Sequence, residues 1–156
     1  VSDPATPEAE TAGLDGVKRG YFLLNTDGGN LRRRPGEPLT LAAIGVLLRT
    51  RRLVHVAQIS RQIGPATHNV AEYRGLIEGL KLAREQGIQR IRVYMDSELV
   101  VDQMNGMAAV KKEHLQALHV VAREVADSFT SIRFSWVPRE MNAEADRLAS
   151  KALSTV

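Results

Sequence analysis

The sequence predicts an α/β domain with a mixed five-stranded sheet, and three observations lead to that prediction. Three stretches with the composition of strands follow one another closely near the start of the chain, which is typical of antiparallel strands. Two later strand-like stretches each follow segments with helical periodicity, so we expect them to return parallel to the first strand. The length of 156 residues fits one domain with its own core. The expected order is βββαβααβα, with helices on both faces of the sheet.

The strands are expected at residues 21–27, 42–49, 52–60, 88–96 and 131–137. The first, YFLLNTD, is apolar until close to its final aspartate, and the loop that follows contains Pro35, Gly36 and Pro38, which interrupt regular structure. The second and third strands are expected to form a hairpin. Its linking residues, Arg-Thr-Arg-Arg at 49–52, contain no strong turn signal, so the type of turn stays open.

Helical periodicity predicts helices at residues 66–87, 97–106, 111–128 and 142–153. Gly87 and Gly106 are expected to end the first two, because glycine readily adopts the left-handed conformation that terminates helices. Ser97 is expected to cap the start of the second helix. We expect no internal repeat and no second domain in these residues.

Charge is distributed unevenly along the chain. The sequence has 21 Lys and Arg against 18 Asp and Glu, but residues 1–16 hold four acidic and no basic residues, which leaves 21 basic and 14 acidic residues in 17–156. We predict a disordered acidic tail at 1–17, because this segment is also poor in bulky apolar residues, followed by one basic domain at 18–156. A basic domain suits a polyanionic partner, although a solvated surface of mixed charge would explain it too.

Composition excludes several classes of protein. The chain has no cysteine, so disulfide frameworks and thiolate zinc sites are excluded. No apolar run approaches the ~20 residues that span a bilayer, and the first residues lack a charged-then-apolar signal pattern. We therefore expect a cytoplasmic protein without membrane contact. The sequence indicates no protein partner.

Four acidic residues fall where strands end and helices begin. Asp27 ends the first predicted strand and Asp96 the fourth, while Glu72 and Asp146 lie early in the first and last helices. If the first and fourth strands are central neighbours, these carboxylates meet at one edge of the sheet. Converging carboxylates repel one another, and a hard divalent cation such as Mg²⁺ or Mn²⁺ relieves the repulsion through oxygen ligands. Two such ions ~3.5–4 Å apart can activate water and stabilise the leaving oxygen in phosphodiester hydrolysis.

Each acid also has a simpler explanation. Asp27 before two glycines suits a turn, Glu72 suits the positive end of a helix dipole, and Asp96 suits a helix cap. Asp146 suits an exposed ion pair with a basic neighbour. The shared position of all four at one predicted edge favours a metal site over four unrelated explanations.

Four blocks of the chain resemble the signature blocks of the type I ribonuclease H family, in its bacterial and archaeal variant: NTDGG, THNVAEYRGLIEGL, VYMDSELVV and WVPREMNAEADRLASKAL. The resemblance runs in order from about Tyr21 to Leu153, and each block carries one of the four acids. It implies the ribonuclease H-like fold. It also implies an endonuclease that hydrolyses the RNA strand of RNA·DNA hybrids with two Mg²⁺ ions, for which Mn²⁺ substitutes, leaving 5′-phosphate and 3′-hydroxyl ends.

The resemblance implies a role for each acid. Asp27 would bridge the two ions, and Glu72 would contact one ion and the RNA 2′-hydroxyl beside the cut. Asp96 and Asp146 would complete the separate ligand shells.

Substrate contacts are implied for further positions, namely Gly28, Gly29, Thr67, His68, Asn69 and Glu98. The glycines would leave the RNA backbone room to approach, and Thr67 would bind a DNA phosphate. His68 and Asn69 match polar positions in the minor groove, and Glu98 stands where the family often has a glutamine. Thr67 as a helix cap and Asn69 as a turn residue remain alternatives.

The chain departs from the family pattern in the loop after the first acid. Arg34 stands in the place of the asparagine of an Asn-Pro-Gly motif, one residue late. Together with Arg32 and Arg33 it is expected to hold phosphate, unless the triplet is only a solvated basic loop.

Two further departures concern basic groups. No histidine lies between Trp136 and Asp146, where many members have one, and we expect Arg139 to replace it in part electrostatically, since arginine is no general base near neutral pH. The short segment 105–113 holds only two lysines where some members carry a basic handle for the DNA strand. Affinity for the hybrid should therefore be modest and fall steeply with salt.

Two rival functions fit a domain of this kind. Another nuclease or strand-transfer enzyme of the superfamily is disfavoured by spacing, because related exonucleases carry two acids two residues apart on the first strand and this chain has Asp27 followed by glycines. A non-catalytic module that binds hybrid or RNA should have lost an acid, whereas all four are present.

Overall fold

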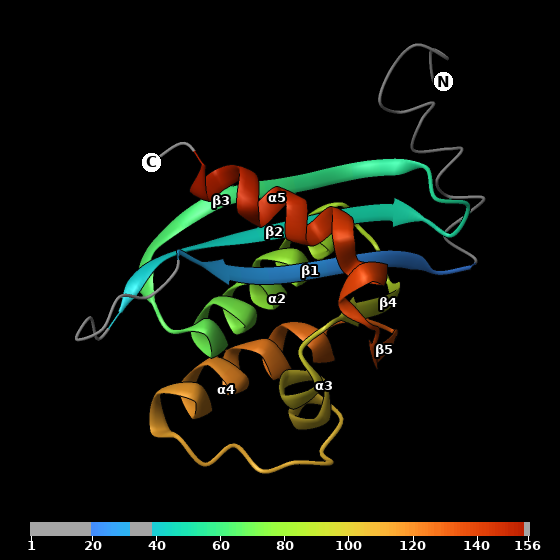
Figure 1. The fold of residues 1–156 in the computed structure, drawn as a ribbon. Helices are drawn as coiled ribbons and strands as arrows, with labels where there is room; N and C mark the ends of the chain where they lie inside the picture. Colours follow the sequence, from blue (N-terminus) through green and yellow to red (C-terminus); the bar gives the residue numbers. More distant parts are fainter. Residues whose placement is uncertain (1–19, 32–38, 155–156) are drawn as a thin grey trace.

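The computed structural model describes residues 20–31 and 39–154, whose strands form one five-stranded sheet in the order β3-β2-β1-β4-β5 (Figure 1). The strands are β1 (Phe22–Asn30), β2 (Thr40–Thr50), β3 (His55–Ala66), β4 (Arg90–Met95) and β5 (Ser131–Trp136). Strands β1, β2 and β3 pair antiparallel, and β4 runs parallel to both β1 and β5. The predicted mixed sheet is confirmed. The first and fourth strands are central neighbours, which is the condition under which the acids were expected to meet.

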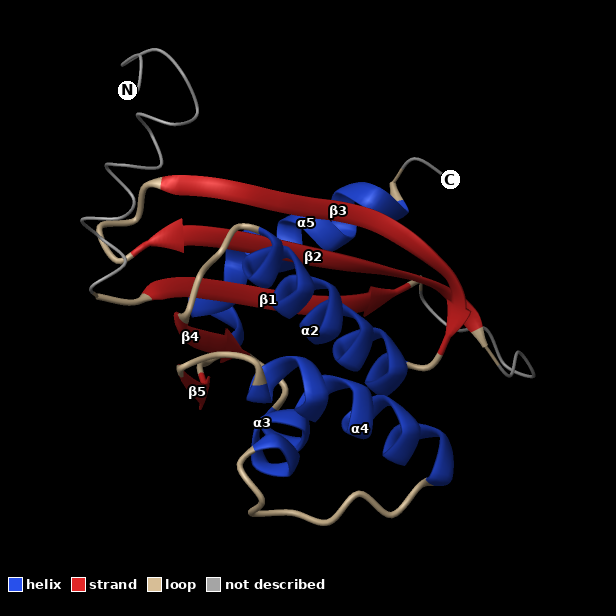
Figure 2. Ribbon diagram, turned by 180° about the vertical axis from the view of Figure 1, so that it is seen from behind, coloured by secondary structure: helices blue, strands red, loops and turns tan. Residues whose placement is uncertain are grey.

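Helices cover both faces of this sheet (Figures 1 and 2). The helices α2 (His68–Glu85), α3 (Glu98–Met104) and α4 (Glu113–Asp127) lie on one side, where the main apolar core forms. On the other side a 3₁₀ helix, η1 (Arg139–Asn142), leads into α5 (Ala143–Leu153), which crosses β1, β2 and β3. None of the helices described is both long and apolar enough to cross a bilayer.

The predicted helix ends are confirmed. The side chains of Thr67 and Ser97 accept hydrogen bonds from backbone N–H groups in the first turns of α2 and α3. Gly87 and Gly106 follow the ends of these helices with φ of 76° and 74°. Because only glycine adopts this conformation at little energetic penalty, these two residues end the helices.

The predicted end of the first strand is wrong. Strand β1 continues past Asp27 to Asn30, and Gly28 pairs with Ile44 of β2. The two glycines therefore lie within the strand and form no turn. The sequence Asp-Gly-Gly at 27–29 is typical of a turn, but pairing with β2 continues through these residues and keeps them in the strand.

The third strand also differs from its predicted range of 52–60. It starts only at His55, because residues 51–54 form the turn, with Leu53 at a φ of 67°. It then runs on to Ala66, past an irregularity in its pairing with β2. The predicted tail at 1–17 and the arginine triplet at 32–34 lie outside the described residues.

Candidate active site

Glycines let helix α2 lie directly against strand β1. A Cβ atom placed on Gly28 would lie 2.2 Å from the backbone carbonyl carbon of Ala71, and one placed on Gly75 would lie 2.7 Å from the backbone oxygen of Asp27. No side chain fits in either place. This close packing puts Glu72, which follows Ala71, beside Asp27 of strand β1.

Helix α5 approaches the opposite face of the sheet in the same way. A Cβ atom on Gly45 of β2 would lie 2.0 Å from the backbone oxygen of Ala145. The first turn of α5 is therefore held against the sheet, and Asp146 lies in that turn. The two helices thus bring carboxylates to the same strand from its two faces.

The four predicted acids meet at this point. Asp27, Glu72 and Asp96 each offer a carboxylate oxygen, and these oxygens lie within 4.8 Å of one another. Asp27 is 5% exposed and Glu72 is fully buried, whereas Asp96 is half-buried. Asp146 lies within hydrogen-bonding reach of Asp27, and its Oδ1 is 3.6 Å from Nη2 of Arg139. We call these four acids the acid cluster.

Burial and mutual repulsion dominate the electrostatics of the acid cluster. Burial raises the pKa of Asp27, and the charges of Glu72 and Asp96 raise it further. Burial also raises the pKa of Glu72, in spite of the N–H of Gly28, which donates to its carboxylate. The pKa of Asp96 is raised by burial and lowered in part by Asn142. The raised pKa values mean that these carboxylates, when ionised, have too little positive charge around them to offset their burial and repulsion.

The cluster has the features of a divalent metal site. Oε1 of Glu72 accepts the hydrogen bond from Gly28, but its Oε2 is buried without a hydrogen-bond partner among the residues described. A buried acceptor without a partner is unfavourable, and a cation would satisfy it. An all-oxygen set of carboxylates suits Mg²⁺, Mn²⁺ or Ca²⁺ rather than softer metals. The residues therefore fit ions held by Asp27, Glu72 and Asp96, with Asp146 beside them.

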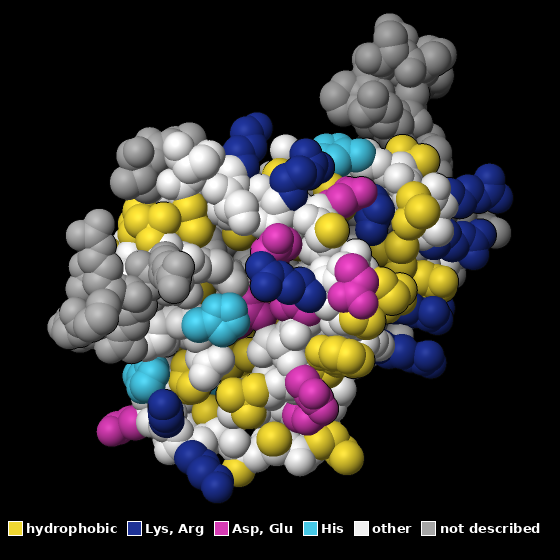
Figure 3. Space-filling view, in the orientation of Figure 1, with side chains coloured by type: hydrophobic (Ala, Val, Ile, Leu, Met, Phe, Trp, Pro, Cys, Tyr) yellow, Lys and Arg dark blue, Asp and Glu magenta, His cyan; other side chains and the backbone are white. Residues whose placement is uncertain are grey.

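A groove of about 630 Å³ opens over the acid cluster. Its walls include five of the other predicted site residues, namely Gly28, Gly29, Thr67, His68 and Arg139. Acidic side chains gather near the middle of this face of the molecule, with basic and histidine side chains beside them (Figure 3). Thr67 both caps α2 and lines the groove, so its two predicted roles are compatible.

Two predicted substrate contacts among the described residues, Glu98 and Asn69, are not brought into the groove. Glu98 is exposed at the start of α3, and Asn69 is half-buried in the first turn of α2, and neither lines the groove. Arg34 lies outside the described residues. The contact roles of these residues stay predictions.

Sequence reasoning missed Asn142, which joins η1 to α5. Its side chain is only 1% exposed, and its Nδ2 donates to the backbone oxygen of Thr26 at 3.0 Å. The sequence did offer a signal for Asn142, because this asparagine stands at the start of the last predicted helix, four residues before Asp146. Its burial next to the acid cluster became evident only from the structure.

Comparison with known proteins decides the family. The sequence pattern of a family described as reverse transcriptase-like matches residues 27–152. Ribonuclease HI of Halobacterium salinarum is 37% identical over 153 residues, which are 98% of this chain and 74% of that protein. The chain belongs to the ribonuclease HI family. The resemblance seen in its four sequence blocks is thereby confirmed.

Solved structures agree with this ribonuclease HI assignment. RNase H1 of Halobacterium salinarum has a TM-score of 0.80 at 34% identity, covering 88% of this chain and 100% of that one. LC11-RNase H1 in complex with an RNA/DNA hybrid has a TM-score of 0.77 at 33% identity, covering 86% of this chain and 97% of that one. The predicted ribonuclease H fold is confirmed.

One relative is much longer than this ribonuclease HI domain. Bifunctional protein Rv2228c of Mycobacterium tuberculosis is 45% identical over 132 residues, which are 84% of this chain but 35% of that protein. The chain therefore spans about a third of the length of this relative. Its N-terminal RNase H domain has been solved as a fusion protein and has a TM-score of 0.78 to this chain at 41% identity, covering 85% of this chain and 98% of that one.

Proposed function

We propose that this chain is an endonuclease that hydrolyses the RNA strand of RNA·DNA hybrids and leaves 5′-phosphate and 3′-hydroxyl ends. The observation that carries the proposal is the acid cluster under the groove, with its unpartnered Glu72 oxygen. The solved complex of the related LC11-RNase H1 with an RNA/DNA hybrid supports the hybrid as substrate.

Each acid has a part in this proposal. Asp27 would hold both divalent ions, Mg²⁺ or in its place Mn²⁺, while Asp96 and Asp146 would complete their separate ligand shells. Oε1 of Glu72 is engaged by Gly28, so its Oε2 is left for an ion and the RNA 2′-hydroxyl. The two ions, when bound, supply activation of water and stabilisation of the leaving oxygen.

The groove residues position the substrate in this proposal. Gly29, half-buried in the groove wall, leaves room for the RNA backbone, as does Gly28. The hydroxyl of Thr67 binds a DNA phosphate, and His68 lies where the minor groove of the hybrid would pass. We propose minor-groove contacts for Asn69 and Glu98 as well, and a phosphate contact for Arg34.

Arg139 acts electrostatically in this proposal. Its side chain is 79% exposed, and its Nη2 lies 3.6 Å from Oδ1 of Asp146, so the guanidinium is free to approach the phosphate that is cut. Arginine stays protonated at neutral pH, and it therefore stabilises negative charge without exchanging protons. A cytoplasmic setting stays a prediction from the composition of the sequence as a whole.

The proposal is tested by cleavage of a hybrid whose RNA strand carries a 5′ label. The chain is incubated with Mg²⁺, with Mn²⁺ and with EDTA, beside double-stranded RNA and double-stranded DNA of the same sequence. We expect internal cuts in the RNA of the hybrid with either metal, no cleavage in EDTA, and fragments whose 3′ ends a polymerase extends. A hybrid that is bound but never cut would favour the non-catalytic module, and degradation only from the ends would favour an exonuclease.

A further inference from the structure

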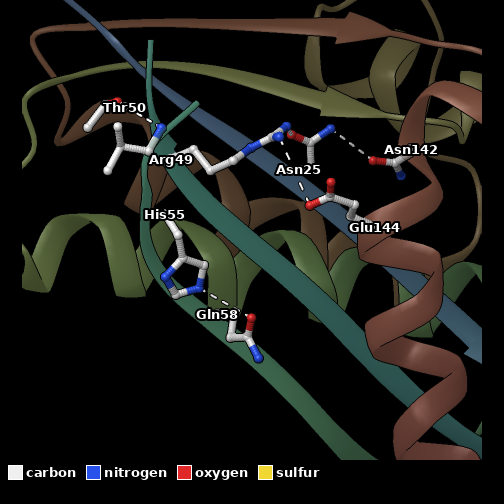
Figure 4. A network of polar contacts seen from close by, with 8 residues as sticks. Asn25, Arg49, Thr50, His55, Gln58, Asn142 and Glu144 are labelled. Atoms are coloured by element: carbon white, nitrogen blue, oxygen red, sulfur yellow. Dashed lines mark hydrogen bonds and ion pairs between the residues drawn. The ribbon is translucent and has the colours of Figure 1, made fainter. Parts of the chain in front are cut away.

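A chain of polar side chains runs from Arg49 on strand β2 through Asn25 to Asn142 (Figure 4). Nη2 of Arg49 donates to Oδ1 of Asn25 at 3.1 Å, and Nδ2 of Asn25 donates to Oδ1 of Asn142 at 3.1 Å. The Nδ2 of Asn142 donates to the backbone oxygen of Thr26 at 3.0 Å, and the Asn142 amide lies near enough to Asp96 to lower the pKa of that carboxyl. Strands β1 and β2 are thus linked to the start of α5 and to a carboxylate of the acid cluster.

The two asparagines in this chain are held in a closed environment. Asn25 is 6% exposed and Asn142 is 1% exposed, so water does not readily replace the hydrogen bonds between them. Buried amide groups that lose their partners are strongly unfavourable. The orientation of each amide is therefore set by its neighbours in the chain.

Arg49 at one end and the Thr26 carbonyl at the other set the direction of the hydrogen bonds in the chain. An arginine side chain only donates, so Asn25 must turn its oxygen toward Arg49 and its nitrogen toward Asn142. Asn142 must then accept with its oxygen, which leaves both N–H groups of its Nδ2 for Thr26 and Asp96. With the opposite orientation, the Asn142 oxygen would face the Thr26 carbonyl and the Asp96 carboxylate and repel both.

We propose that Arg49 is a positioning residue of the metal site, which acts through Asn25 to orient the Asn142 amide toward Asp96. The oriented amide fixes one carboxylate of the acid cluster and also fixes the start of α5, four residues before Asp146. Arg49 is itself anchored, since its Nη1 lies 4.0 Å from Oε2 of Glu144. The inference rests on the proposed function, because it takes the acid cluster to bind divalent cations.

The most informative variant is Asn25→Asp. It preserves the shape of the side chain and strengthens the contact with Arg49, but it replaces a donor with an acceptor. Asn142 must then turn its nitrogen toward position 25 and its oxygen toward Asp96. We expect calorimetric titration with Mg²⁺ to show an affinity weakened about 10- to 100-fold, as for other residues that support a metal ligand. If only the added charge mattered, Asn25→Asp would bind Mg²⁺ more tightly, because a carboxylate attracts cations.

A second pair of variants tests Arg49 itself. Arg49→Lys keeps a group that only donates and should retain Mg²⁺ affinity within a few-fold, whereas Arg49→Met should weaken it about tenfold or more. Arg61→Met is the matched control, because Arg61 lies on β3 and pairs at 2.7 Å with Glu78, on the other side of the sheet from α5. Thermal unfolding confirms that each variant is folded before titration.

The outcomes separate this inference from the proposed function. If Asn25→Asp binds Mg²⁺ as tightly as the unchanged chain, or Arg49→Met behaves like Arg61→Met, the inference is wrong even though the chain cleaves hybrids. If the variants lose Mg²⁺ affinity as expected but the unchanged chain cuts no hybrid, the inference holds and the proposed function fails. An unchanged chain that binds no Mg²⁺ overturns both.

Discussion

The acid cluster has two halves that are held in place by different means. Asp27 and Glu72 are 5% and 0% exposed, and they lie where α2 packs on β1 through close glycine contacts. Asp96 and Asp146 are half-buried and are held by polar contacts with Asn142 and Arg139. The first half is fixed by the packing of the core, and the second by hydrogen bonds and an ion pair.

This difference predicts different responses to substitution. Changes in the packed half should alter the stability of the fold together with activity, because interiors are densely packed and relax little. Changes in the polar half should alter metal binding and turnover while the fold stays intact. The following predictions test this contrast, from the largest expected effect to the smallest.

Asp27→Asn should have the largest effect on activity. We expect cleavage to fall far beyond the ~100-fold seen when only a supporting residue of a metal site is changed, because the bridging carboxylate is lost. In EDTA the same variant should unfold at a higher temperature than the unchanged chain, since the buried Asp27 carboxyl must either carry a repelled charge or take up a proton on folding, and asparagine does neither. Cleavage rates and thermal unfolding measure the two effects.

Asp127→Asn is the matched control, because Asp127 is an exposed acid on α4 paired with Arg123. It should leave cleavage unchanged. Activity of Asp27→Asn within tenfold of the unchanged chain would contradict the assignment of Asp27 as a metal ligand.

Gly28→Ala should have the largest effect on stability. Its added Cβ would lie 2.2 Å from the Ala71 backbone, so the variant should lose about 3 kcal/mol or more in urea unfolding. Gly29→Ala is the control, because its Cβ would make an ordinary contact at 3.8 Å with Ala149. Equal losses in the two variants would show that the packing of α2 on β1 does not depend on Gly28.

The pH dependence of the metal-free chain comes next. The folded state raises the pKa values of Asp27 and Glu72 above their ordinary 3.8 and 4.5, so it holds protons that the unfolded state releases. The free energy of unfolding should therefore fall as the pH rises from about 4 toward and beyond neutral. Each unit of pKa difference corresponds to about 1.4 kcal/mol, or roughly 4 °C in Tm for a domain of this size.

Thermal unfolding in EDTA across this pH range measures the effect. Asp27→Asn should show a shallower fall than the unchanged chain, because one of the two shifted groups is gone. A Tm that rises with pH over the same range in the unchanged chain would contradict a cluster that lacks positive charge.

Arg139→Ala should have the smallest of these effects. Interactions of exposed charges contribute less than ~1 kcal/mol, so turnover should fall by up to about fivefold with little change in affinity for the hybrid or in Tm. Arg147→Ala, another exposed arginine of this region on α5, should change neither turnover nor affinity. Unchanged turnover in Arg139→Ala would remove Arg139 from the proposed mechanism.

The two halves of the cluster also differ in how far the sequence predicts them. The order of elements followed from hydrophobic periodicity, and with it the expectation that Asp27 and Asp96 meet if β1 and β4 are neighbours. The structure shows that these two strands are neighbours. The continuation of β1 through Gly28 could not be predicted locally, since an Asp-Gly-Gly stretch also suits a turn. The strand continues there because β2 pairs with it. Glycine is required at position 28 because the α2 backbone lies where a side chain would be.

The polar network was beyond sequence reasoning for a different reason. Asn25 and Asn142 are separated by 117 positions along the chain, and neither residue type indicates burial. An asparagine becomes a buried partner only when the three-dimensional fold supplies matching donors and acceptors. Arg49, which lies near the end of β2 and has basic neighbours in sequence, likewise looks like part of a solvated basic surface.

The central claim is that the core holds Asp27 and Glu72 together, against their repulsion, in order to bind a divalent cation. The most direct measurement is thermal unfolding of the unchanged chain and of Asp27→Asn at pH 8, with and without MgCl₂ at constant ionic strength. We predict that Mg²⁺ raises the Tm of the unchanged chain and leaves that of Asp27→Asn nearly unchanged. Equal Mg²⁺ responses in the two proteins would contradict the claim.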